Sequence, residues 1–427
     1  MINGDNMKLK KTKDDVNEKK LKEKNDVNAE NKGFSVSEVI ILFIIALILG
    51  FSIGSLIRSN VIISSKGKII SDKYLNEFIK NYEYIIDNYY EEVDKDDLIK
   101  NAISGMMNSL DDPYSVYFDE SESSNFNITL DGSYKGIGVQ ISKEKETGYM
   151  VVISVLENSP ASRADLKAGD KIIELDGESV KDLSISEFSS SVRNSSAKSF
   201  DLTVLREDEQ FSLTLVKDEI VLSSVASKTY ERNAKKIGYI YIGIFASNTS
   251  SQFEEELKKL ESENISALII DVRSNTGGHL TSVDGILELF LNSSQIKYQF
   301  EKKEKVTPVY AKGNESKSYP VILLGNEYSA SASEVLIAGL CENIDATFIG
   351  KKTYGKGTVQ ELVTLDKNTQ YKITTKKWLT PKGNWINDTK GIEPDIEVDL
   401  GDDYQNTKSD EDDHQLQKAL EYIESLK

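Results

Sequence analysis

The spacing of apolar residues divides the chain into segments of different character. Residues 1–38 are polar and lysine-rich and show no apolar period, which is typical of a segment without a folded core. Residues 39–57 form an uncharged, mostly apolar run of 19 residues, long enough to cross about 30 Å of hydrocarbon as a helix. A cleaved signal peptide is the alternative, although its apolar region usually covers only about 7 to 15 residues. We predict an uncleaved transmembrane signal anchor.

Residues 72–120 have the period of amphipathic helices. The apolar stripe of the first helix consists of Leu75, Phe78, Tyr82, Ile85 and Tyr89, and that of the second of Leu98, Ala102, Met106 and Leu110. The second helix should end before Pro113, because a proline disfavours helical backbone in the residue that precedes it. Both apolar faces need a partner surface.

Residues 130–218 change to short alternating strands. These are predicted at Val139–Ile141, Met150–Val155, Phe200–Val204 and Phe211–Leu215. Two short helices are predicted between the strands, near Pro160–Leu166 and Ile185–Val192. The order predicts a small domain that is mainly β with two helices.

Residues 222–400 alternate between buried strands and helices, which predicts an α/β domain. Continuous apolar runs predict strands at Ile237–Ile242, Ala267–Asp271 and Val321–Leu324, and a β-rich run predicts another at Tyr371–Leu379. One helix should bury Phe253, Leu257 and Leu260 and begin with a capping box of Ser251 and Glu254, and another should follow at Val335–Leu340. Residues 401–427 are an acidic, solvated tail that ends in a short helix with Leu416, Leu420 and Ile423 on one face.

Charge and composition narrow the range of functions. The chain has 427 residues and a net charge of −18. Residues 1–38 hold nine lysines and eight acidic residues, so the part that follows carries about −19, which argues against binding nucleic acid. The lysines before the span favour a cytoplasmic N-terminus and an extracytoplasmic bulk of the chain. A single cysteine, Cys341, excludes an internal disulfide framework.

The candidate chemistry lies at a turn between a strand and a helix. Three serines, Ser329, Ser331 and Ser333, precede the helix predicted at Val335–Leu340. The first turn of a helix offers unpaired N–H groups and a positive dipole end to a developing negative charge. A nucleophilic serine is one interpretation, and ordinary capping is the other. A nucleophile also needs a base, and Lys356, 25 residues after Ser331, can act as one if burial lowers its pKa.

Three sequence blocks carry a resemblance to a known family. Ser329–Glu334, Tyr354–Gln360 and Asp271–Gly278 resemble the signature blocks of the C-terminal processing peptidases, which are serine proteases with a Ser/Lys dyad. The resemblance extends from about Tyr74 to Val398. It implies that Ser331 is the nucleophile, that Lys356 is the general base and that Gln360 orients the lysine. Glu334 also matches a family residue, although its position in the helix is explained by capping alone.

Two glycine motifs complete the predicted sites. Gly277 and Gly278 follow a buried strand, and an N–H group of this pair could join that of Ala332 in an oxyanion hole. Gly136, Ile137, Gly138 and Val139 resemble the carboxylate-binding loop of a PDZ domain, and Gly169–Gly177 resembles its following hairpin. A PDZ domain binds an extended peptide at its sheet edge, which implies recognition of substrate C-termini. In relatives the N-terminal helices often mediate dimer contacts, so a homodimer is a further expectation.

The resulting prediction is a multidomain protein with one transmembrane helix, a helical segment, a PDZ domain and an α/β serine protease domain. It is expected to cleave proteins that have exposed C-termini and to need no cofactor, since Cys and His are too few for a zinc site and the acidic runs lack calcium-loop spacing. A glycine-rich run that ends in Lys356 lacks the hydroxyl residue of a phosphate-binding loop. The alternatives are an inactive membrane-anchored PDZ scaffold and a Ser/His peptidase that uses His279.

Overall fold

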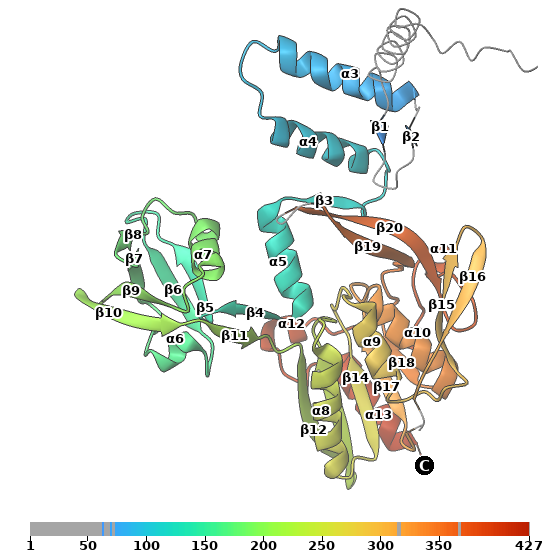
Figure 1. Cartoon of the computed structure of the whole chain (residues 1–427). Coiled ribbons are helices and arrows are strands. Elements are labelled where there is room, and N and C mark those ends of the chain that lie inside the picture. The colour runs from blue at the N-terminus through green and yellow to red at the C-terminus, as the bar shows by residue number, and fades with distance from the viewer. Residues whose placement is uncertain (1–61, 64–68, 71–72, 314–316, 366–368, 427) are drawn as a thin grey trace, which may run out of the picture. The chain divides into compact units, whose positions relative to one another are not determined.

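The computed structural model of the chain describes residues 62–63, 69–70, 73–313, 317–365 and 369–426 (Figure 1). Residues 1–99 and 100–427 form two compact units, and each is described by itself. The span predicted at residues 39–57 lies outside the described residues. Within the described part of the chain, no helix is both long and apolar enough to cross a bilayer.

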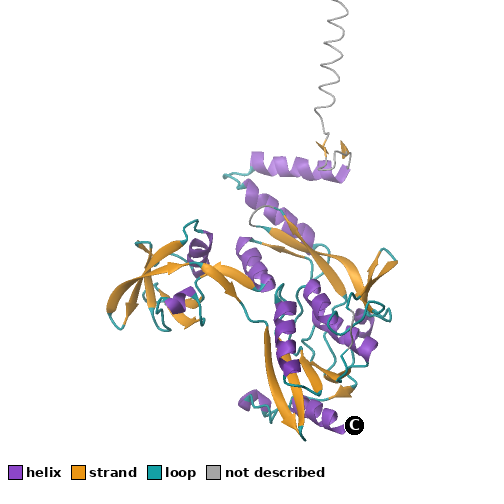
Figure 2. Cartoon of the chain, turned by 60° about the horizontal axis from the view of Figure 1, so that its bottom comes forward, coloured by secondary structure: helices purple, strands orange, loops and turns teal. Residues whose placement is uncertain are grey.

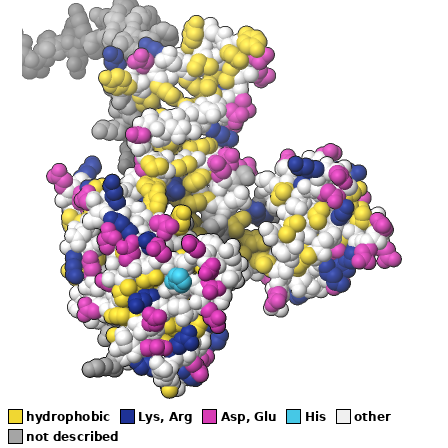
Figure 3. Space-filling model, turned by 180° about the vertical axis from the view of Figure 1, so that it is seen from behind, with side chains coloured by type: hydrophobic (Ala, Val, Ile, Leu, Met, Phe, Trp, Pro, Cys, Tyr) yellow, Lys and Arg dark blue, Asp and Glu magenta, His cyan; other side chains and the backbone are white. Residues whose placement is uncertain are grey.

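The first unit contains a small strand pair and one long helix. Strand β1 (Ile62–Ile63) pairs antiparallel with β2 (Ile69–Ile70), and helix α3 (Lys73–Asn88) follows. The helix confirms the first amphipathic prediction, but none of its residues is buried. Its exposed apolar side chains include Tyr74, Phe78, Tyr84 and Ile85. Hydrophobic side chains, drawn in yellow, are also visible on the described helices at the top of Figure 3.

Helix α4 (Lys95–Asn108) confirms the second amphipathic prediction. It leads to strand β3 (Val116–Phe118) and to helix α5 (Glu120–Asp131), which the apolar pattern did not predict. The helix α5 begins at a capping box, in which the Asp119 side chain accepts from the Glu122 N–H and the Glu122 side chain accepts from the Asp119 N–H. Only this capping signal marked the helix in the sequence.

A small β domain follows. Its strands are β5 (Val139–Lys143), β6 (Met150–Val155), β7 (Lys171–Leu175), β8 (Glu178–Ser179), β9 (Ser199–Arg206) and β10 (Glu209–Val216), and its helices are α6 (Pro160–Arg163) and α7 (Ile185–Asn194). The sheet order is β10-β9-β7-β6-β5, with β8 on β7. The four predicted strands and both predicted helices are confirmed. Strands β4 (Ser133–Gly136) and β11 (Asp218–Val221) pair with each other where the chain enters and leaves this domain.

The third part is an α/β domain around a six-stranded sheet. Its strands, in sheet order, are β12 (Val225–Arg232), β13 (Lys235–Ile242), β14 (Ala267–Asp271), β17 (Val321–Gly325), β18 (Thr347–Gly350) and β21 (Ile396–Glu397). Strand β12 is antiparallel to its neighbour, and all other neighbouring pairs are parallel. The strands predicted from continuous apolar runs are confirmed.

Both faces of this sheet are covered (Figure 2). Alternate residues of a strand point to opposite faces, so Leu323 joins one core and Leu324 the other. The first core includes side chains of α8 (Thr249–Ser262), α9 (Leu280–Leu287) and α10 (Ala332–Ile344). The second core is completed by α13 (His414–Ser425).

The predicted start of the first protease helix was wrong. Helix α8 begins at Thr249 with Asn248 as its N-cap, so Ser251 lies inside the helix and forms no capping box with Glu254. The apolar period carried the right information about the buried face, because Phe253 is buried there as predicted. The local Ser-x-x-Glu pattern did not decide where the helix begins.

A second sheet of the α/β domain packs against the core that contains α10. Its strands are β16 (Lys305–Tyr310), β15 (Ile296–Lys302), β20 (Gln370–Leu379) and β19 (Thr358–Thr364), with β3 added on β20. Trp378 of β20 is buried in the core that contains α10. The short helices α11 (Ile386–Thr389) and α12 (Tyr404–Thr407) lie in the connections that follow.

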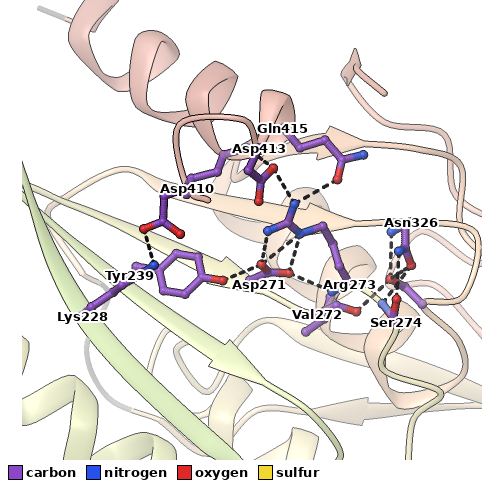
Figure 4. Close-up of polar contacts among 12 residues, drawn as sticks. Lys228, Tyr239, Asp271, Val272, Arg273, Ser274, Asn326, Asp410, Asp413 and Gln415 are labelled. Carbon is purple, nitrogen blue, oxygen red and sulfur yellow. Dashed lines mark hydrogen bonds and ion pairs between the residues drawn. The ribbon is translucent and has the colours of Figure 1, made fainter. Parts of the chain in front are cut away.

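The acidic tail is not entirely solvated, contrary to the prediction (Figure 4). Asp413 is buried and forms an ion pair of 2.8 Å with Arg273, which also pairs with Asp271 at 2.6 Å. The hydroxyl of Tyr239 donates to Asp271 at 2.6 Å. The tail therefore supplies a carboxylate to a buried cation at the end of β14. A net-charge count along the sequence cannot reveal such a pairing.

Candidate active site

Three loops of the parallel sheet meet at one edge. Strands β14, β17 and β18 are neighbours and end at Asp271, Gly325 and Gly350. Gly277, Ser331 and Lys356 each lie six positions after one of these ends. The carboxyl ends of parallel strands are the usual place for ligands in such sheets. The topology thus explains why three distant sequence blocks form one site.

The three serines of the turn differ in their surroundings. Ser329 and Ser333 are fully buried, and their hydroxyls donate to the carbonyls of Val272 and Asn275, both at 2.8 Å. Ser331 is only half-buried and lines a cleft. It is the N-cap of α10 with φ 56° and ψ −112°, a conformation that is strained for a residue with a side chain. Ser329 and Ser333 fasten the turn, and Ser331 faces the cleft.

The glycine loop packs directly against this serine. A Cβ on Gly277 would lie 2.9 Å from the Cβ of Ser331, so no other residue fits at this position without displacement. The N–H of Gly277 donates to the Asn275 side chain at 2.9 Å. Among the described residues, the N–H groups of Gly278 and Ala332 have no acceptor. Of the predicted oxyanion donors, these two are therefore available to a substrate oxygen in this structure.

Asn275 was not identified from the sequence, although it links the two loops. It is fully buried, its side chain donates to the carbonyl of Ile242 at 2.9 Å, and its backbone carbonyl accepts from the N–H of Ala330 at 3.0 Å. The glycine loop and the serine turn are thereby held to each other. The sequence signal that could have identified Asn275 is its position as a polar residue between a buried strand and the paired glycines.

Lys356 lies in the same cleft as Ser331. Its amine lies 4.6 Å from the centre of the Tyr114 ring. Burial, and to a smaller extent the charge of Lys372, lower the pKa of Lys356 to about 8, although the charges of Asp112 and Glu334 oppose the shift. No hydrogen bond joins the side chains of Ser331 and Lys356 among the described contacts, and such bonds are often long when no substrate is bound.

Glu334 ties the serine turn to the lysine loop. The carboxylate is fully buried and accepts from the N–H groups of Ser331 (2.8 Å), Gly355 (2.6 Å) and Lys356 (2.9 Å) and from the Thr353 hydroxyl (2.6 Å). Burial raises its pKa, and these hydrogen bonds oppose the rise. Capping alone had been sufficient to explain this residue in the sequence, but its contacts extend well beyond its own helix.

The other predicted residues of the site have different partners. The amide nitrogen of Gln360 donates to the hydroxyls of Thr358 and Thr374, both at 3.0 Å. His279 is the N-cap of α9 and lines the cleft. In the described part of the chain, no group of three His, Cys, Asp or Glu side chains is placed to hold a metal ion.

The cleft has a volume of about 770 Å³ and is lined by all six residues predicted for the catalytic centre: Gly277, Gly278, Ser331, Ala332, Lys356 and Gln360. Its walls are otherwise largely apolar and include Phe126, Leu130, Val335 and Trp378. A separate groove of about 180 Å³ lies in the β domain and is lined by Gly136, Ile137, Gly138 and Val139 together with residues of α7. The structure thus separates the predicted sites into two hollows.

Comparison with known proteins agrees with this architecture. The carboxy-terminal processing protease CtpB of Bacillus subtilis (strain 168) is 36% identical over 330 residues, which cover 77% of this chain and 68% of that protein. The chain belongs to the carboxy-terminal processing proteases. CtpA of the same organism is 33% identical over 343 residues, covering 80% of this chain and 72% of that protein. A probable CtpA-like serine protease of Staphylococcus aureus (strain COL) is 32% identical over 328 residues, which cover 76% of this chain and 65% of that protein.

Three family models divide this carboxy-terminal processing protease into parts. Residues 57–122 match the N-terminal domain of the activating protease CtpB, residues 136–216 match a PDZ domain and residues 236–398 match peptidase family S41. The chain is therefore a serine peptidase of a family with a Ser/Lys dyad, and the β domain is a PDZ domain. Helices α12 and α13 lie after the matched regions.

Proposed function

We propose that this protein is a membrane-anchored endopeptidase that cleaves proteins near their C-termini, with Ser331 as nucleophile and Lys356 as general base. The observation that carries the proposal is the shared cleft of a serine in a strained turn and a lysine whose pKa is lowered by burial. A lysine with a pKa of about 8 holds a substantial neutral fraction near that pH, as a base must.

The reaction follows from these groups. The Ser331 hydroxyl attacks the scissile carbonyl while the neutral Lys356 amine accepts its proton. The N–H groups of Gly278 and Ala332 stabilise the negative charge on the carbonyl oxygen. Lys356 then protonates the leaving amine, and an acyl-enzyme forms that water hydrolyses with the same lysine as base. Glu334 holds the backbone of both loops in register through its hydrogen bonds.

The alternatives make different predictions. A Ser/His mechanism would use His279, whose side chain also faces the cleft. An inactive scaffold would keep peptide binding in the PDZ domain and show no cleavage. Ser331→Ala, Lys356→Ala and His279→Ala, assayed on a peptide with a free C-terminus, separate the three cases. We expect the first two variants to be inactive and the third to remain active. Activity in Lys356→Ala would exclude the dyad.

We further propose that the PDZ domain binds substrate tails and controls the cleft through helix α5. Ile128 of this helix lines the PDZ groove, whereas Phe126 and Leu130 line the catalytic cleft. Arg193 at the end of α7 also donates to the Ser124 hydroxyl of the same helix. A peptide in the groove therefore touches an element that also forms a wall of the cleft, and a tail bound there raises the local substrate concentration.

The PDZ domain could act by tethering, in which it only holds the substrate near the cleft, or by gating, in which it controls the activity of the cleft itself. Removal of the PDZ domain distinguishes the two. Deletion of residues 136–218 should slow cleavage of tailed substrates but spare a short reporter if the domain only tethers. It should accelerate both reactions if the resting domain inhibits the cleft, which is the form of control that we favour. Cleavage rates are also compared for a substrate that ends in a free carboxylate and for the same substrate with a C-terminal amide, each with the full-length protein and with the deletion variant. This comparison tests whether the PDZ domain recognises the C-terminal carboxylate. Equal rates in all four combinations would contradict tail recognition.

We propose that residues 39–57 anchor the protein in the cell membrane, with the PDZ and protease domains on the extracytoplasmic side. The support is the length of the apolar run and the lysines that precede it. Protease treatment of intact cells should then remove the bulk of the chain. A mature protein that begins after Ser59 would contradict an uncleaved anchor.

A homodimer is the final part of the proposal. The exposed apolar face of α3 is the surface that such a dimer would cover. Sedimentation of the full chain should give a dimer that Phe78→Glu disrupts, since a buried charge in an apolar interface is costly. A monomer in the unmodified protein would contradict it.

A further inference from the structure

The catalytic cleft carries positive charge in an acidic chain. The whole protein has a net charge of −18, yet no Asp or Glu is found among the described residues that line the cleft. Its two side chains with amines are Lys356 and Lys372. A general base must be neutral when it acts, so Lys356 cannot serve as a fixed cation in the same step. Lys372 is therefore the lysine of the cleft that can bind a negatively charged group of the substrate.

Lys372 is held in place but has no anionic partner among the described residues. It lies on β20 opposite Leu362 of β19 and Val116 of β3. Its amine is 5.5 Å from the centre of the Phe118 ring and 5.2 Å from that of Phe126, so two aromatic faces support the cation.

Asp112 is the acidic group whose charge acts on Lys372, but its hydrogen bonds go to other groups. It accepts from the N–H of Tyr114 at 3.1 Å and from the Ser115 hydroxyl at 2.6 Å, and it forms no ion pair with Lys372 among the described residues. Most other half-buried lysines of this domain form an ion pair, as Lys317 does with Glu261 at 2.7 Å. A half-buried amine without a carboxylate gains more from a ligand carboxylate than an exposed one does, because less water competes for the charge.

The direction of the cleft follows from the mechanism. Lys356 returns its proton to the leaving amine, so the C-terminal fragment begins on the lysine side of the scissile bond. From Lys356 the chain continues along β19 through Gln360 to Leu362, which pairs with Lys372, and all of these residues line the cleft. The charge of Lys372 lowers the pKa of Lys356, so the two amines lie close enough for an interaction that water does not fully screen, within about 10 Å. Extended chain rises about 3.3 Å per residue, so a leaving fragment of about three residues reaches from the scissile bond to Lys372.

We propose that Lys372 binds a carboxylate of the leaving fragment, in the first place the C-terminal carboxylate of the substrate. The inference rests on the proposed function, because it needs Lys356 on the leaving side. It gives the cleft its own means of selecting chain ends, in addition to the PDZ groove. An Asp or Glu side chain at the same place offers the same chemistry, so the test must separate the two sources.

The test measures kcat/KM for matched peptides that differ only after the scissile bond. Leaving fragments of three to six residues end in a free carboxylate, in an amide, or in an amide with Asp as the last residue. We expect the unmodified protein to prefer the best free-acid peptide over its amide by about tenfold, the effect of one charge-assisted hydrogen bond. Restored cleavage of the Asp amide would assign the site to any carboxylate, and no restoration to the terminal one.

Variants assign the preference to Lys372. Lys372→Met should reduce the ratio of acid to amide to about one, and Lys372→Arg should keep most of it. Lys372→Glu should invert the preference toward an amide that ends in Lys. Lys376→Met is the matched control, since this lysine lies on the same strand outside the lining of the cleft and pairs with Glu361 at 2.7 Å. The PDZ domain is unchanged in every variant, so its own preference cancels in the comparison.

Failure of the carboxylate site at Lys372 and failure of the proposed protease function give different results. If the unmodified protein cleaves neither peptide, or if Ser331→Ala still cleaves them, the proposed function fails. If the unmodified protein and Lys372→Met show the same ratio of acid to amide, the carboxylate site is overturned while the protease remains. Thermal unfolding of each variant confirms that the ratios come from folded protein.

Discussion

The catalytic cleft and the PDZ groove are assembled in opposite ways. The groove is lined by residues from two nearby stretches, 128–141 and 188–193. The cleft is lined by residues that range from Tyr114 to Trp378. A groove made of local backbone can be recognised from one short motif. A cleft made of distant loops depends on many contacts that hold those loops together, and Glu334 and Asn275 supply several of them. Perturbing these contacts should therefore affect the cleft and spare the groove.

The largest expected effect comes from the base itself. Lys356→Arg should lower kcat by about four orders of magnitude or more, because arginine keeps its proton at any working pH. Binding of a tail peptide to the PDZ groove should not change, and fluorescence anisotropy measures it on the same sample. Turnover near the level of the unmodified protein would remove Lys356 from the mechanism.

The next effect should come from Glu334→Gln. The amide keeps the shape of the side chain, but its NH₂ group must face backbone N–H groups that also donate. In one orientation these are the N–H groups of Ser331 and Lys356, and in the other it is that of Gly355. We expect a loss of about 2–4 kcal/mol in the free energy of unfolding and a loss of about 100-fold in kcat. Chemical denaturation and peptide cleavage measure the two quantities. A fully stable and active variant would show that the loops do not depend on this carboxylate.

A smaller effect is expected from the groove. Gly138 has φ +76°, and a Cβ there would lie 2.3 Å from the Cβ of Ser159. Gly138→Val should therefore distort the loop and weaken binding of a free tail by about tenfold, within the range of a lost charged hydrogen bond. Gly169→Val is the control, because Gly169 also has a positive φ but its Cβ would meet open space. Equal tail binding in both variants would argue against this loop as the carboxylate site.

The smallest effect should come from the acidic tail. Asp413→Asn keeps an N-cap for α13 but removes the ion pair with Arg273, and we expect a loss of about 1–3 kcal/mol in stability. Asp402→Asn, an exposed change in the same tail, is the control. Thermal unfolding compares the variants. No difference between them would mean that Asp271 alone satisfies Arg273.

The sequence predicted the elements better than their contacts. Strands such as Val321–Leu324 were predictable because buried parallel strands are continuous apolar runs, and the helix period placed Phe253 in the core. Helix α5 was missed because its sequence is polar and rich in Ser and Asn. The roles of Asn275 and Asp413 depend on partners far along the chain, which no local pattern specifies.

The most direct test of the central claim is the pH dependence of kcat/KM in the unmodified protein and in His279→Ala. The pKa of Lys356 lies below its ordinary value, so the amine loses its proton as the pH rises through about 8. If Lys356 is the base, kcat/KM should be low below this pH, rise with a midpoint near 8 and reach a plateau above it. The His279→Ala variant should show the same midpoint. A midpoint near 6.5, the ordinary value for histidine, that disappears in His279→Ala would contradict the Ser331–Lys356 dyad.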